Sequence, residues 1–209
     1  MNCPEGKEGG STVAWSDGRT EISVLRRDVA TFIEERGWGR YHAPVNVASA
    51  TAVEAGELLE LFQWRRPGDP VPEDVVRAAG SELADVLHFT LCLANAADLR
   101  LPVDGSTLSQ VVPGPGERDP GPKEAAEEVM VAASFLLMAA RASALTSEVA
   151  ETLGEGDSSD ALEASVMLLL EALVKCARSL DLDLSAQLHS KNRLNEERFP
   201  VGTMPDAGY

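Results

Sequence analysis

Two consecutive segments of helical pattern carry acidic residues inside their apolar stripes. At about 100° per residue, Glu54 falls on a stripe with the apolar residues Val47, Ala50, Leu58 and Leu61. In the next segment, Glu82 shares its stripe with Val75, Val86, Phe89 and Leu93. Glu57 and Asp85 each lie one step to the side. Both acid pairs should therefore point into a bundle of helices.

Carboxylates in such a position need a compensating charge, because each loses its hydration and repels the others. Neither stripe contains Lys or Arg, so bound cations are the better remedy. Oxygen ligands select hard cations such as Mg²⁺ or Mn²⁺. The i, i+3 spacing lets two facing helices hold two or more ions, and the predicted ligands are Glu54, Glu57, Glu82 and Asp85. Such a site suits phosphoryl transfer.

A di-iron carboxylate bundle is the nearest alternative to this magnesium site. Its usual signature is a Glu-x-x-His pair on each of two helices. Glu82, Asp85 and His88 match one such pair in part. A second histidine at this spacing is missing, which makes the di-iron interpretation the weaker one.

The remaining sequence also predicts an all-α fold. No stretch shows sustained alternation with a period of two, and aromatic residues make up only 5% of the chain, which favours helix over sheet. Gly37 should end the first helix, and Asn46 should cap the second at its N-terminus. Helices are expected at about 22–36, 46–64, 74–99, 123–150, 160–180 and 184–198.

Composition divides the chain into successive regions. Residues 1–20 are rich in Gly, Ser and charge and should form a mobile tail, and 21–101 form a catalytic helical half. Pro and Gly recur through 102–122, which predicts a linker. A second helical half with a closing helix follows at 123–200, and a short tail at 201–209.

Charge and cysteine content limit the partners and the compartment. The formal net charge is −16, which repels phosphate backbones and argues against a polymeric nucleic-acid ligand. No signal peptide or membrane span is evident. Cys92 and Cys176 fall in apolar helical stretches and should be buried, reduced thiols. These features indicate a cytoplasmic protein.

Three stretches, in order, make the chain resemble a known group of proteins. They are ERGWGRYHAPVNVASATAVEAGELLELFQW at 35–64, SELADVLHF at 81–89 and K-x-x-x-N-x-x-R-F-P at 191–200. They resemble the MazG-like all-α nucleoside triphosphate pyrophosphohydrolases, and within them the dCTP pyrophosphatase branch. The resemblance covers about residues 22–101 and 179–200.

The resemblance implies Mg²⁺-dependent hydrolysis of a nucleoside triphosphate, dCTP or a modified dCTP above others, to the monophosphate and pyrophosphate. It makes the same four acids the metal ligands, and one of them, or a water that they orient, supplies the base. Trp38, His42 and Trp64 match positions that line the base pocket. Phe89 stands where some relatives have Tyr, so that hydroxyl is absent here.

The chemistry of these residues leaves alternatives open. Trp64 lies two turns beyond Glu57 on the same stripe, so its ring could stack on a base or pack in the core. His42 could simply brace its loop. In the last helix, the stripe of Leu184 and Leu188 continues as Lys191, Asn195 and Arg198. These could reach phosphates or be ordinary exposed groups near a helix C-terminus.

The segment 102–178 departs from the compact family pattern and suggests a degenerate second copy. EAAE at 124–127 echoes EAGE at 54–57, and EASV at 163–166 falls where ELAD at 82–85 would fall. The chain would then be a single-chain pseudo-dimer with one complete set of acids. Ala/Glu-rich helices also produce such matches by chance.

Two rival functions remain. One is a pyrophosphohydrolase for another nucleotide, such as dUTP or an oxidised purine, and the other is a non-catalytic nucleotide-binding or regulatory bundle. The sequence contains neither G-x-x-x-x-G-K-[ST] nor G-x-S-x-G, so P-loop and serine-hydrolase sites have no support. An exposed bundle face would favour a homodimer.

Overall fold

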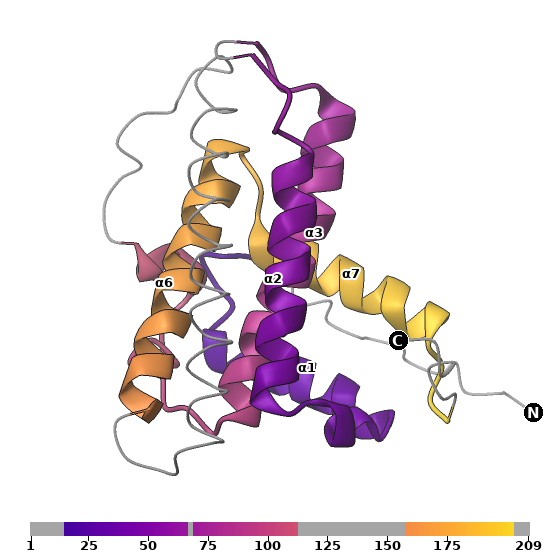
Figure 1. Cartoon of the computed structure of the whole chain (residues 1–209), viewed down its shortest axis with the longest axis vertical. Coiled ribbons are helices and arrows are strands. Elements are labelled where there is room, and N and C mark those ends of the chain that lie inside the picture. Colours follow the sequence, from indigo (N-terminus) through magenta and orange to yellow (C-terminus); the bar gives the residue numbers. More distant parts are fainter. Residues whose placement is uncertain (1–14, 67–68, 113–157, 203–209) are drawn as a thin grey trace, which may run out of the picture.

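The computed structural model describes residues 15–66, 69–112 and 158–202, and their regular structure is helical (Figure 1). The elements are α1 (Ile22–Glu35), η1 (Trp38–Tyr41), α2 (Pro44–Glu60), α3 (Glu73–Ala96), α4 (Leu108–Val111), α6 (Ser158–Ser179) and α7 (Leu184–Arg198). Within these ranges the only β-type pairing is an isolated bridge between Glu21 and Thr107. The predicted all-α class is confirmed.

The ends of α1 and α2 show how local chemistry sets the helix boundaries. Gly37 follows α1 in the left-handed conformation, with φ of 66°, as a helix-ending glycine does. The prediction that Asn46 caps α2 was wrong, because Pro44 already occupies the first turn and Ala43 is the N-cap. Proline suits the first helical position, where its missing N–H costs nothing. Asn46 instead donates a hydrogen bond to the carbonyl of Tyr41, at 3.3 Å.

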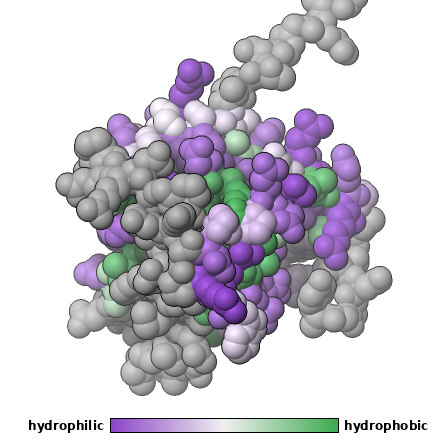
Figure 2. Space-filling view, turned by 90° about the horizontal axis from the view of Figure 1, so that it is seen from above, coloured by the Kyte–Doolittle hydropathy of each residue, from purple (hydrophilic) through white to green (hydrophobic). Residues whose placement is uncertain are grey.

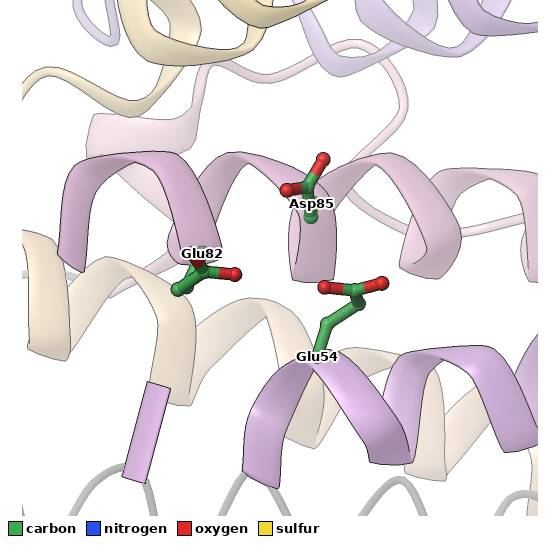
Figure 3. A group of neighbouring side chains, drawn as sticks. All are labelled: Glu54, Glu82 and Asp85. Carbon is green, nitrogen blue, oxygen red and sulfur yellow. The ribbon is translucent and has the colours of Figure 1, made fainter. Parts of the chain in front are cut away.

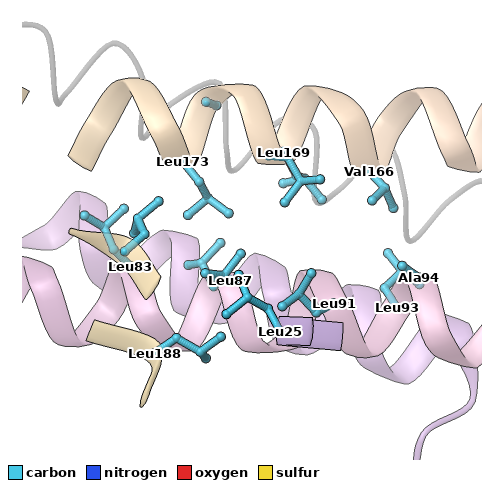
Figure 4. Close-up of a cluster of buried hydrophobic side chains, with 14 of the residues drawn as sticks. Leu25, Leu83, Leu87, Leu91, Leu93, Ala94, Val166, Leu169, Leu173 and Leu188 are labelled. Atoms are coloured by element: carbon cyan, nitrogen blue, oxygen red, sulfur yellow. The ribbon is translucent and has the colours of Figure 1, made fainter. Parts of the chain in front are cut away.

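The central helix is α3, which contacts α1, α2, α6 and α7. Apolar residues of α3 face α6 across a closely packed layer (Figure 4), and they include Leu83, Leu87 and Leu91 on α3 with Leu169 and Leu173 on α6. Because α3 packs against helices on several sides, its rotation and its position along the bundle are fixed. The positions of the acidic residues on α3 are therefore fixed as well.

Helix α7 runs across the long axes of α2 and α3 (Figure 1) and is held at both ends. At its start, the Asp17 carboxylate accepts hydrogen bonds from the N–H groups of Leu184 and Ser185, at 2.9 and 2.7 Å. At its end, the buried Arg36 donates from Nε to the carbonyl of Phe199, at 2.7 Å. Residues 15–20, which the sequence assigned to a tail, therefore contact the closing helix in part.

The predicted second half is described only in part. The expected helix at 160–180 corresponds to α6, where Val166 is buried and Glu163 is half-buried. The expected helix at 123–150, with Glu124 and Glu127, lies outside the described residues, as does 113–122 of the expected linker. The described part of that linker includes α4. The pseudo-dimer stays a prediction.

On the face seen in Figure 2, hydrophilic side chains surround a smaller group of apolar ones. Cys92 and Cys176 are buried free thiols, as predicted, and burial raises the pKa of each to about 12. Among the described helices, none has the length and apolar character needed to cross a bilayer.

Candidate active site

The acidic residues predicted on two helix stripes meet where α2 packs on α3. Glu54 comes from α2, and Glu82 and Asp85 come one turn apart from α3. Figure 3 shows the Glu54 carboxylate between the two helices, beside the side chains of Glu82 and Asp85. One oxygen from each lies within 4.8 Å of the others, and all three residues are half-buried. Glu57, the fourth predicted ligand, is exposed on α2 and lies outside this group.

Burial and mutual repulsion make ionisation of this cluster costly. Burial, followed by the charges of Asp85, Glu57 and Glu82, raises the pKa of Glu54 from 4.5 to about 7. Burial is also the main cause that raises the pKa of Glu82 and of Asp85. Although Glu57 is exposed, its charge contributes to all three shifts.

The donor set of this cluster fits a hard divalent cation. Mg²⁺ prefers carboxylate oxygens at about 2.1 Å, and oxygens as close as these three can converge on one ion. A bound cation would also relieve the repulsion that raises the carboxylate pKa values. No nitrogen or sulfur ligand joins the group in the described part of the chain, which favours Mg²⁺ or Mn²⁺ over zinc.

The closing helix contributes a cation that the two acidic stripes lack. The Lys191 ammonium on α7 forms an ion pair with the Asp85 carboxylate and donates a hydrogen bond to the Ser81 hydroxyl at 2.7 Å. Bound cations were preferred from the sequence because neither acidic stripe contains Lys or Arg, and the structure adds a basic partner from a third helix. Among the described residues, Glu54 and Glu82 form no ion pair within 4 Å.

A buried polar network joins α1, α3 and α7 beside this contact. His88 Nδ1 donates to the Asn192 side-chain oxygen at 3.1 Å, and Asn192 Nδ2 donates to Asp28 at 2.9 Å. Burial lowers the pKa of His88 to about 4, so its ring is neutral at physiological pH. Because Nδ1 of His88 is engaged and the ring is outside the carboxylate group, the partial di-iron match receives no support.

Aromatic side chains gather next to this network. Trp38 packs edge-to-face on Phe32 and on Phe199, with ring centroids 5.7 and 5.4 Å apart. His42 donates from Nδ1 to the Trp38 carbonyl at 2.9 Å. This hydrogen bond braces the loop, which is the structural role considered for His42 from the sequence. Within the described residues, the Trp38 indole N–H is the one buried side-chain polar atom without a hydrogen-bond partner. It is a donor available to a ligand.

The other predicted substrate residues occupy different environments. Because α2 ends at Glu60, Trp64 lies in the turn beyond it and is 89% exposed, which excludes the core-packing alternative. Phe89 is half-buried against the His88 ring, at 5.5 Å between centroids. Asn195 is half-buried, and the exposed Arg198 guanidinium lies 5.0 Å from the Phe199 ring centroid.

Two residues beside the carboxylate cluster, Asn192 and Ser81, were not predicted from the sequence. Asn192 follows Leu184 and Leu188 at successive i+4 positions, so its place on the buried stripe of α7 could have been predicted from the periodicity. Ser81 carries no comparable signal, because its importance arises from a residue that is distant in the chain, Lys191.

Comparisons with known proteins relate part of this chain to one kind of enzyme. It is 41% identical over 86 residues to "dCTP pyrophosphatase 1" of Homo sapiens, a match that covers 39% of this chain and 51% of the human protein. It is 42% identical over 85 residues to the protein of that name from Rattus norvegicus, covering 39% and 50%. The Bos taurus protein of that name is 39% identical over 85 residues, with the same coverage.

The chain spans about half the length of the curated relatives that it matches. No protein-family model matches it, and no solved structure matches it either. The matched part of this chain is therefore similar to several mammalian proteins that share the name dCTP pyrophosphatase 1.

Proposed function

We propose that this protein is a nucleoside triphosphate pyrophosphohydrolase that converts dCTP, or a modified dCTP, to the monophosphate and pyrophosphate. The observation that carries the proposal is the carboxylate group of Glu54, Glu82 and Asp85, in a chain whose matched relatives are named dCTP pyrophosphatase 1. Three half-buried carboxylates this close together lose hydration and repel one another. A helical module that only binds other proteins would gain nothing from this cost.

In this proposal Glu54, Glu82 and Asp85 hold Mg²⁺ or Mn²⁺, and Glu57 joins from the exposed side when the substrate is present. Bound metal supplies charge neutralisation for the phosphate oxygens and activation of a water. One of the four carboxylates would orient a water and accept its proton. The enclosing helices α2 and α3 keep these groups fixed, which matters because phosphoryl transfer depends mainly on positioning and electrostatics.

The remaining predicted residues divide between the phosphates and the base. Lys191 stands beside the carboxylates, where an ammonium can pair with a phosphate, and Asn195 and Arg198 follow it on α7. Trp38 offers its unpartnered indole N–H to a base carbonyl. Trp64, which is exposed, offers a ring face on which a base can stack, and His42 and Phe89 complete this set.

A substrate panel tests the proposal. The protein is incubated with Mg²⁺ and each of the common NTPs and dNTPs, with 5-methyl-dCTP as a modified substrate, and monophosphate and pyrophosphate are quantified. We expect dCTP or 5-methyl-dCTP to be hydrolysed fastest, with equal amounts of both products, and EDTA to abolish turnover.

Other outcomes would change the proposal in different ways. Faster hydrolysis of dUTP or an oxidised purine nucleotide would retain the reaction and replace the substrate. Release of orthophosphate as the primary product would contradict the proposed bond cleavage. Binding of nucleotides without any turnover would favour a regulatory bundle over an enzyme.

A further inference from the structure

We propose that Lys191 competes with the divalent cation for Asp85, so that metal binding and release of the Lys191 ammonium towards the triphosphate are coupled. This inference rests on the proposed function, because it concerns the same site. It assigns Lys191 two alternative partners, the Asp85 carboxylate and a substrate phosphate, in place of a phosphate contact alone.

The contacts of Lys191 place its ammonium at the carboxylate cluster. Its ammonium pairs with Asp85, one of the three clustered carboxylates, and so provides positive charge where a cation would bind. The side chains of Lys191 and Asp85 are only 24% and 16% exposed. At such partial burial the ion pair is screened less by water than a surface pair, and breaking it has a measurable cost.

The backbone of α7 around Lys191 is held by contacts on both sides of this residue. Asn192, next to Lys191, is 3% exposed and is hydrogen-bonded to both His88 and Asp28. The ends of α7 are tied to Asp17 and Arg36. The backbone at Lys191 is therefore held, and the lysine has to change partner by rotating its own flexible stem.

The charges of the metal, of Lys191 and of the triphosphate act on one another. A divalent cation held by Glu54, Glu82 and Asp85 repels the nearby ammonium, while a bound triphosphate attracts it. Ser81 remains as a neutral acceptor for Lys191 at the edge of the site. Metal and nucleotide therefore favour the same displaced position of Lys191, which makes their binding mutually reinforcing.

The experiment compares Mn²⁺ binding, by isothermal titration and by electron paramagnetic resonance, in the wild-type protein and in Lys191→Met and Lys191→Gln. We expect both variants to bind Mn²⁺ about five- to tenfold more tightly in the absence of nucleotide, because Asp85 no longer has to give up an ion pair. With saturating Mn²⁺, we expect both to bind a non-hydrolysable dCTP analogue more weakly than the wild type does.

Lys175→Met is the matched control. Lys175 is an exposed lysine on α6 that pairs with Glu171 at 3.7 Å, so its replacement changes the net charge equally but leaves the site intact. We expect wild-type Mn²⁺ affinity for it. Circular dichroism melting confirms that each variant is folded, and Lys191→Gln, which keeps polarity, covers the case in which Lys191→Met does not fold.

Unchanged or weaker Mn²⁺ binding by folded Lys191 variants would overturn the competition. So would equal tightening in Lys175→Met, because the effect would then reflect net charge. Turnover of dCTP by the wild type tests the proposed function separately. An active wild type with no tightening in the Lys191 variants rejects the competition alone, whereas tightening in a protein without turnover rejects the pyrophosphohydrolase alone.

Discussion

Glu54 is the acidic residue of the cluster for which folding raises the pKa most clearly. Its pKa rises from 4.5 to about 7, first through burial and then through the charges of Asp85, Glu57 and Glu82. Between these two values the folded protein retains a proton that the unfolded chain releases. Folding stability therefore falls as the pH rises through this window and stays lower above it.

Replacing Glu54 with Gln should consequently stabilise the protein when metal is removed. In EDTA at pH 8, we expect Glu54→Gln to be more stable than the wild type by about 1 kcal/mol, a modest value because water still reaches part of the carboxylate. The difference should shrink towards pH 4.5. Denaturant unfolding across this pH range measures it. A variant that is less stable than the wild type at pH 8 would refute the electrostatic description of the cluster.

Glu57 differs from the other three acids in its position, so its replacement should affect metal binding differently. It is exposed and outside the group whose oxygens lie within 4.8 Å. We expect Glu82→Gln to weaken nucleotide-free Mn²⁺ binding by more than about tenfold, and Glu57→Gln to weaken it by less. Titration calorimetry of both variants provides the comparison. Equal losses would mean that Glu57 is a full ligand in the absence of substrate.

At the scale of secondary-structure elements, α7 depends on a few polar contacts because its surface is mostly polar. Asp17 and Arg36 hold its two ends, and Asn192 holds its middle to α1 and α3. These contacts place Lys191 beside Asp85. A buried network of this kind fixes one packing arrangement only while every member has its partner.

Asn192→Leu should therefore destabilise the protein out of proportion to its size. It leaves the N–H of the buried His88 and the carboxylate of Asp28 without Asn192 as a partner, for which we expect a loss of about 2–4 kcal/mol. Thermal unfolding monitored by circular dichroism measures this loss. Arg193→Leu, at the exposed neighbouring position, should change stability by less than about 0.5 kcal/mol. Similar effects of the two changes would contradict the assigned role of the network.

The sequence predicted those elements whose boundaries depend on local chemistry. Gly37 and the apolar spacing predicted α1, and the Leu184–Leu188 stripe predicted α7 with its observed bounds. The start of α2 was wrong because a capping side chain at Asn46 and a proline at Pro44 are competing local signals, and the proline prevailed. Helical periodicity also predicted that Glu54 lies near the acidic residues of α3, because the periodicity determines which face of a helix is buried.

The remaining part of the site could not be predicted because it depends on how distant helices pack. The Lys191–Asp85 ion pair and the Asn192–His88 hydrogen bond each join residues about a hundred positions apart. No local pattern states which way α7 crosses α3. The burial of the Trp38 indole N–H without a partner in the described structure likewise follows from tertiary packing.

At the scale of the whole molecule, the described residues place the cluster of Glu54, Glu82 and Asp85 between α2 and α3. The predicted echo at 163–166 has the buried Val166 in the position corresponding to Asp85. A second metal site built on Glu124 and Glu127 would thus lack an acid. We expect the double variant Glu124→Gln/Glu127→Gln to retain at least half of the wild-type rate of dCTP hydrolysis. A loss above about tenfold would mean that the second half contributes to catalysis.

We propose that the carboxylates between α2 and α3 make this protein a metal-dependent pyrophosphohydrolase. The most direct measurement is the rate of pyrophosphate release from dCTP with Mg²⁺, by the wild-type protein and by Glu82→Gln with equal secondary structure. We predict wild-type turnover and a fall of at least about a hundredfold in the variant, as for loss of a group that stabilises developing charge. Wild-type rates in Glu82→Gln would contradict it.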